Sequence, residues 1–95
     1  MIKHTVFFSL KHAEGSEAEQ AFFRSGAELA AIPGVRDFRR VKQVSRKNDF
    51  AYGFLMGFDD EGAYRAYSEH PAHVAFVRDH WIPEVARFLE IDYLE

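Results

Sequence analysis

Apolar and polar side chains alternate along residues 2–10, and this period of two predicts a β-strand. The more apolar of its faces carries Ile2, His4, Val6, Phe8 and Leu10. Residues 88–94 alternate in the same way and predict the last strand. One of its faces carries Leu89, Ile91 and Tyr93, and the other carries Glu90 and Asp92.

The strand predicted over residues 50–58 is apolar on both faces, which is typical of a strand in the middle of a sheet. One face carries the large side chains of Phe50, Tyr52, Phe54, Met56 and Phe58. The opposite face carries Ala51, Gly53, Leu55 and Gly57. Small residues allow close approach, so we expect this face to be covered, with a second sheet as the candidate.

Residues 35–46 are predicted to form an edge strand, because basic side chains on both of its faces discourage unwanted edge pairing. The basic residues are Arg36, Arg39, Arg40, Lys42 and Arg46. The polar turn at residues 47–49 then predicts a hairpin that leads into the strand over 50–58.

Helical regions separate these strands. Ser16 and Glu19 form a predicted capping box, in which each side chain satisfies the other's backbone donor, and the helix should run to about residue 32 before Pro33-Gly34. Acidic residues 59–61 predict the start of a helix over residues 60–69. Pro71 interrupts it and opens a short helix, which Trp81-Ile82-Pro83 is expected to break before a turn over residues 83–87.

The resulting order, β-α-β-β-α-β over residues 1–95, predicts a single α+β domain with the ferredoxin-like fold. Two helical regions would cover one face of a four-stranded sheet and leave the other face bare. That bare face would carry apolar residues of the strand over 50–58, so we expect a homodimer in which a second sheet covers it, forming a dimeric α/β barrel.

Composition narrows the function classes. Aromatic residues make up 16% of only 95 residues, which favours a partner subunit or an enclosed cavity. The absence of cysteine excludes a disulfide framework, a thiolate metal site and a cysteine nucleophile. A net charge of −3 without a basic patch argues against nucleic acid. No apolar run approaches about 18 residues and no signal-peptide pattern is present, so we expect no membrane span and a cytoplasmic protein.

Histidine and tyrosine are the main candidates for chemistry. If the helices cover the even-numbered face of the strands, the side chains of His4, Tyr52, Tyr67 and His73 converge inside the subunit. Imidazole titrates near neutral pH and can move protons there. The alternative is that each histidine is a core residue with one hydrogen-bond partner and each tyrosine a packing residue.

Metal binding is the weaker hypothesis. His70, His73 and His80 are spaced by three and seven residues, but Pro71 separates the first two and no fixed set of ligands appears. We therefore expect no metal and no cofactor. The acidic run at residues 59–61 is better explained by the start of a helix than by a carboxylate site.

The whole chain resembles the stress-responsive dimeric α/β-barrel (Dabb) family. The resemblance rests on Ile2-Lys3-His4-Thr5-Val6, Ile32-Pro33-Gly34-Val35, Asp92-Tyr93 and above all the segment from Tyr67 to Val77, which contains Tyr-x-x-His-Pro-x-His. It implies a ferredoxin-like subunit whose sheet meets its partner's sheet in an eight-stranded barrel.

One plant branch of this family, similar to olivetolic acid cyclase, closes a linear polyketide by intramolecular aldol condensation. The resemblance implies His73 as general base, His4 as a pocket histidine and Tyr67 as a supporting group. Tyr52 and Gly26 stand where that cyclase carries a histidine and a tyrosine, so we expect a different substrate.

The expected function is that of a homodimer binding a small, largely apolar or aromatic ligand between sheet and helices, with weak cyclase- or lyase-like acid–base activity. The expected ligand-binding residues are Tyr52, Phe22, Phe54, Phe76 and Val77. The alternatives are a non-enzymatic, stress-associated dimer with a packed interior, and a cofactor-free monooxygenase on the same barrel architecture. A cavity of about 300 Å³ or more would favour ligand binding.

Overall fold

The computed structural model describes residues 1–95 and has the predicted α+β order. The strands are β1 (Ile2–Leu10), β2 (Arg36–Lys42), β3 (Tyr52–Phe58) and β4 (Val85–Leu94). The helices are α1 (Glu17–Ala27), which continues as the 3₁₀ turn Glu28–Ala31, then α2 (Glu61–Glu69), α3 (Pro71–Phe76) and α4 (Ile82–Glu84), with the π-helical segment Val77–Trp81 joining the last two. The ferredoxin-like prediction is confirmed.

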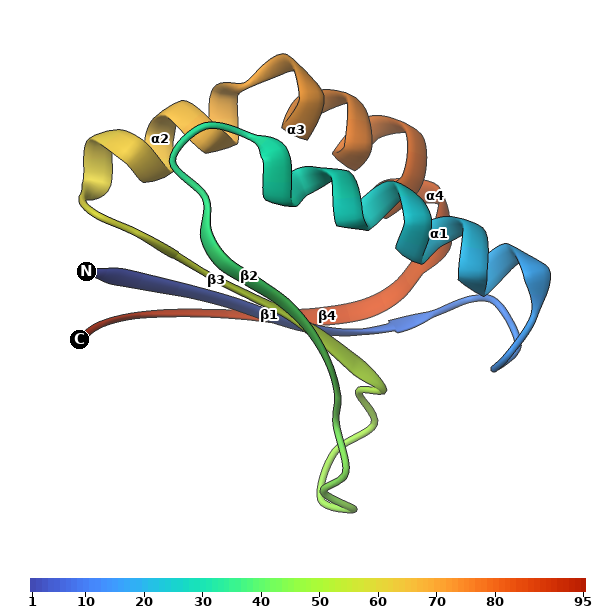
Figure 1. Cartoon of the computed structure of the whole chain (residues 1–95). Coiled ribbons are helices and arrows are strands. Elements are labelled where there is room, and N and C mark those ends of the chain that lie inside the picture. Colours follow the sequence, from blue (N-terminus) through green and yellow to red (C-terminus); the bar gives the residue numbers. More distant parts are fainter.

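All neighbouring strands are antiparallel, and their order in the sheet is β2-β3-β1-β4. The helices lie together on one face of the sheet, and the two chain ends lie side by side (Figure 1). β3 is central and β2 is at an edge, as the charge and size patterns predicted. None of the helices has the length and apolar character needed to cross a bilayer. The cytoplasmic location stays a prediction.

The core lies between the sheet and the helices and is built mainly from aromatic rings. Phe8, Phe22 and Phe58 are completely buried. The ring of Phe8 lies 4.9 Å from that of Phe54 and 5.0 Å from that of Trp81, centroid to centroid. The even-numbered faces of β1 and β3 therefore face the helices, as predicted.

The opposite face of the sheet has no covering element within the chain. Leu89, Ile91 and Tyr93 on β4 are 50%, 52% and 45% exposed. Gly53 on β3 also belongs to this face, but a Cβ atom there would lie 2.6 Å from the ring of Phe7 on β1. The neighbouring Phe7 therefore accounts for the glycine at this position, so its small size is no sign of an approaching second sheet.

The helical region after Pro71 differs from the prediction. Trp81-Ile82-Pro83 does not break it, because the chain passes through a wide π turn and stays helical as far as Glu84. Pro83 has no N–H to donate, and the helical stretch ends one residue later, at Glu84. β4 therefore begins at Val85 instead of residue 88. β2 and β3 are shorter than predicted, spanning Arg36–Lys42 and Tyr52–Phe58.

The predicted capping box at the start of α1 is half right. The Glu19 backbone N–H donates to Ser16 Oγ at 3.2 Å, as predicted. The Glu19 carboxylate, however, accepts from the N–H of Gly15 at 3.1 Å, while the N–H of Ser16 donates to the carbonyl of Ala13. The second oxygen of that carboxylate accepts from the Tyr52 hydroxyl at 2.9 Å, so Glu19 ties the helix start to β3.

Candidate functional site

A cavity of about 340 Å³ lies between the sheet and the helical region that follows Pro71. Its lining is largely apolar and consists of His4, Val6, Leu29, Phe54, Met56, Tyr67, His73, Phe76, Val77, Trp81, Ile82, Phe88 and Glu90. Its polar members come from four elements, and only the fold brings them together. They are His4 on β1, Tyr67 on α2, His73 on α3 and Glu90 on β4.

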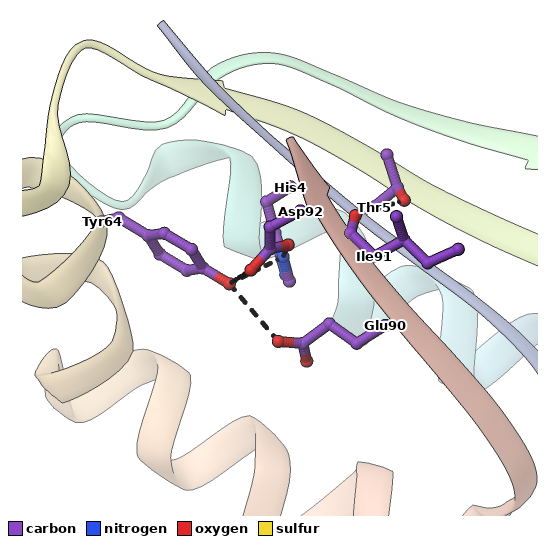
Figure 2. A network of polar contacts seen from close by, with 6 residues as sticks. All are labelled: His4, Thr5, Tyr64, Glu90, Ile91 and Asp92. Atoms are coloured by element: carbon purple, nitrogen blue, oxygen red, sulfur yellow. Dashed lines mark hydrogen bonds and ion pairs between the residues drawn. The ribbon is translucent and has the colours of Figure 1, made fainter. Parts of the chain in front are cut away.

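His4 is held by two polar side chains at the edge of this cavity. The antiparallel register places His4 on β1 opposite Asp92 on β4, so both side chains project from the same face. His4 Nδ1 lies 2.6 Å from Asp92 Oδ1 and 2.8 Å from the Tyr64 hydroxyl. That hydroxyl reaches across from α2 and donates to Asp92 Oδ2 at 2.7 Å (Figure 2).

These contacts determine which nitrogen of the His4 imidazole carries the proton. A carboxylate accepts hydrogen bonds only, so Nδ1 carries the proton that it donates to Asp92. In the neutral ring, Nε2 is then an acceptor, and it has no hydrogen-bond partner in the protein. A carboxylate that accepts from Nδ1 in this way fixes the tautomer and the orientation of the imidazole and leaves Nε2 as the proton acceptor.

His73 on α3 is a second oriented imidazole. Its Nδ1–H donates to the backbone carbonyl of Ser68 at 3.0 Å, and its ring lies 4.5 Å from that of Tyr67. Burial lowers the pKa of His73, and the Ser68 carbonyl offsets part of this effect. The ring is therefore neutral near pH 7, and its Nε2 is a free acceptor without a protein partner.

Tyr67 supplies the complementary donor. The residue is 2% exposed and lines the cavity, and its hydroxyl makes no hydrogen bond within the protein. Burial, with a smaller contribution from the negative charge of Glu90, raises the pKa of Tyr67, so the phenol stays protonated. The site thus offers two unpaired acceptors, on His4 and His73, and one unpaired donor on Tyr67.

Six of the eight sequence-predicted site residues lie together. His4, Tyr67, His73, Phe54, Phe76 and Val77 all line the cavity. Tyr52 and Phe22 do not: Tyr52 pairs with Phe8, four residues along β1 from His4, and its hydroxyl is bonded to Glu19. Phe22 is completely buried in the core. The residue of β3 that lies beside His4 is Met56.

Three polar residues of the site were absent from the prediction: Tyr64, Glu90 and Asp92. The signal for the two acids was present in the sequence. Because Leu89, Ile91 and Tyr93 belong to the bare face, the alternation of the last strand places Glu90 and Asp92 on the helix side. Only the register could show that Asp92 lies opposite His4.

The same cluster contains the set of side chains that most resembles a metal site. His4, Glu90 and Asp92 each offer a ligand atom, and these atoms lie within 4.8 Å of one another. The Tyr64 hydroxyl, however, lies among them and hydrogen bonds His4 and Asp92, so the cluster is satisfied within the chain. Of the histidines considered for a metal, His70 caps α3 and His80 pairs with Glu84 at 3.0 Å.

We expect the buried phenols to resist ionisation in alkaline solution. Burial and the hydrogen bond to Glu19 raise the pKa of Tyr52 to about 12, and burial raises the pKa of Tyr64 and Tyr67 as well. Since the folded pKa exceeds the unfolded value of about 10, the resulting stabilisation is complete below about pH 10 and is lost as the pH rises through the folded values.

An ultraviolet titration near 295 nm, with a denaturant midpoint at each pH, measures this behaviour. Tyr52→Phe should remove the phenolate step near pH 12. Ionisation of Tyr52, Tyr64 and Tyr67 at pH 10 in the folded protein would contradict their described burial and hydrogen bonds.

Comparisons with known proteins identify the family of this chain. The model of the stress responsive A/B barrel (Dabb) domain matches residues 2–95. The chain belongs to the Dabb family. A Dabb family protein with a ferredoxin-like fold from Mesorhizobium loti is 52% identical, with a TM-score of 0.96 over 99% of this chain and 95% of that one. A search of curated proteins finds no match.

Two more distant structures share the fold of this Dabb chain. A dimeric ferredoxin-like protein of unknown function from Thermobifida fusca is 20% identical, with a TM-score of 0.81 over 99% of this chain and 90% of that one. The hydroxynitrile lyase of Passiflora edulis is 14% identical, with a TM-score of 0.86 over 99% of this chain and 92% of that one. At these identities the likeness concerns the fold alone.

Proposed function

We propose that this Dabb protein is a homodimer that binds a small, largely apolar ligand between sheet and helices and moves a proton on it. The observation that carries the proposal is the cavity of about 340 Å³, because unpaired atoms of His4, His73 and Tyr67 belong to its lining. A volume above about 300 Å³ is typical of ligand sites and favours this function over a packed structural dimer.

The chemistry follows from the protonation states. Neutral His73 takes a proton from a carbon next to a ligand carbonyl through Nε2, and the electron pair of the broken C–H bond moves onto the carbonyl oxygen. The Tyr67 hydroxyl donates a hydrogen bond to that oxygen where negative charge develops. His4, whose ring Asp92 orients, is the second proton carrier. Return of the proton from His73 restores the site.

Proton abstraction beside a carbonyl begins an aldol ring closure, and return of a proton to the enolate carbon ends a retro-aldol cleavage, so the proposal covers cyclase- and lyase-like reactions. The reaction needs no cofactor, since both bases and the donor come from the chain.

The dimer proposal rests on the bare face of the sheet. Leu89 and Ile91 are half exposed there, and an apolar patch of this kind is typical of a covered interface. The fold relative from Thermobifida fusca is itself described as dimeric. We propose that a second copy of this chain covers the face, sheet against sheet.

The proton-transfer step is tested with 2-octanone, an uncharged ketone with exchangeable protons beside its carbonyl. In D₂O the protein should accelerate the loss of these proton signals in the NMR spectrum, and His73→Gln should slow the catalysed exchange by about a hundredfold. Oxygen uptake with quinol-like substrates tests the alternative of a cofactor-free monooxygenase.

The matched control is His12→Gln. His12 lies outside the cavity lining and pairs with Glu84 at 2.8 Å, so its replacement should leave the exchange rate unchanged. Exchange at the buffer rate in the unsubstituted protein, or equal loss in both variants, would refute the assignment of His73 as the base.

A further inference from the structure

We propose that Glu90 makes this cavity selective for charge, so that it takes uncharged amphipathic molecules and rejects carboxylates of the same skeleton. This inference rests on the proposed function and names the class of its ligand. Glu90 acts here as a specificity-determining residue, without a part in the proton transfer itself.

The charges around the cavity support this assignment. Of the 13 lining residues none is lysine or arginine, and Glu90 is the one carboxylate among them. Glu90 forms no salt bridge, and its nearest polar contact is the Tyr64 hydroxyl at 3.5 Å. The neighbouring Asp92 adds a second negative charge beside His4. No lysine or arginine of the lining is therefore in place to receive an anionic ligand group.

The negative charge of Glu90 also reaches the groups that would meet the ligand. It adds to the raised pKa of Tyr67 and counteracts the lowered pKa of His73. Glu90 is itself exposed, but an anionic group placed between these side chains would lie a few ångströms from its like charge and be repelled by it.

The sheet beneath the cavity has a polar end and an apolar end. His4 and Asp92 face each other near one end of the ladder, whereas Phe8 and Phe88 face each other four residues further along β1. At about 3.3 Å per residue the two ends are about 13 Å apart. The apolar end continues past Trp81 and Ile82 into an open hollow whose one charged residue, Arg87, pairs with Asp49 at 2.8 Å. The site thus suits a molecule with one uncharged polar group and an apolar tail.

Octanamide and octanoate differ only in the group that carries the charge, so they are the probes. Trp81 is the single tryptophan and lines the cavity, so its emission reports binding. We expect octanamide to bind at least about tenfold more tightly than octanoate at pH 7.5. Glu90→Gln should reduce this preference, and Glu90→Lys should reverse it. Glu28→Gln removes an exposed carboxylate from outside the lining and should leave the preference unchanged.

The outcomes separate this inference from the function on which it rests. Octanoate binding as tightly as octanamide, or equal effects of the changes at Glu90 and Glu28, would overturn the role of Glu90 while the ligand-binding function stands. If neither probe changes the Trp81 emission or the melting temperature, ligand binding itself fails. Val77→Phe, which narrows the cavity, should weaken octanamide binding, whereas Val74→Phe on the exposed side of the helix should not.

Discussion

Replacing Ile91 by lysine is expected to convert the proposed dimer into a monomer at micromolar protein concentration. Ile91 is 52% exposed on the bare face of the sheet, and a second copy would bury it. An ammonium group held in an apolar interface without a partner costs several kcal/mol in lost hydration. A two-fold symmetric interface would contain this lysine once from each subunit, so its cost counts twice. We therefore expect the dissociation constant to rise at least about a hundredfold.

Sedimentation velocity across a concentration series measures this effect. The matched control is Val44→Lys, because Val44 is 85% exposed in the connection between β2 and β3 and lies outside the strands. Its replacement should leave the dimer intact. If the unsubstituted protein sediments as a monomer at micromolar concentration, or if Ile91→Lys remains dimeric, the sheet face is not the interface.

The fold could be predicted because each strand has its own periodic signal. The alternation in residues 2–10 and the two apolar faces of residues 50–58 depend only on local sequence, and both patterns placed the correct side chains toward the helices. The helical region after Pro71 was harder, because Pro83 is normally a sign of helix termination. A single π turn, which has no clear pattern in the sequence, carries the chain on to Glu84.

The candidate site could be predicted only where it depends on which face a residue occupies. His4 and His73 project inward from their elements, and the Tyr-x-x-His-Pro-x-His segment contains both Tyr67 and His73. Tyr52 occupies the correct face but lies at the level of Phe8, because the register between β1 and β3 decides the position along the strand. The register between β1 and β4 likewise places Asp92 opposite His4.

Replacing Phe8 by alanine is expected to lower the free energy of unfolding by about 3–5 kcal/mol, the largest single effect on stability that we foresee. Phe8 is completely buried on the central strand β1, and its ring lies within 6.3 Å of the rings of Phe22, Phe23, Tyr52, Phe54 and Trp81, centroid to centroid. These neighbours come from three other elements and are themselves held by the sheet and helices, so they can only partly fill the space that the ring leaves.

Chemical denaturation at a fixed protein concentration measures the loss, since the stability of a dimer depends on concentration. For a domain of this size the change corresponds to a melting temperature lower by at least about 12 °C. The matched control is Phe88→Ala, because Phe88 faces Phe8 across the ladder but is 54% exposed and should cost less than about 1.5 kcal/mol. Similar losses for the two variants would contradict a core centred on Phe8. A large loss for Phe8 alone would show that the rings around it form one packed unit, which holds β1 and therefore His4 in place beneath the cavity.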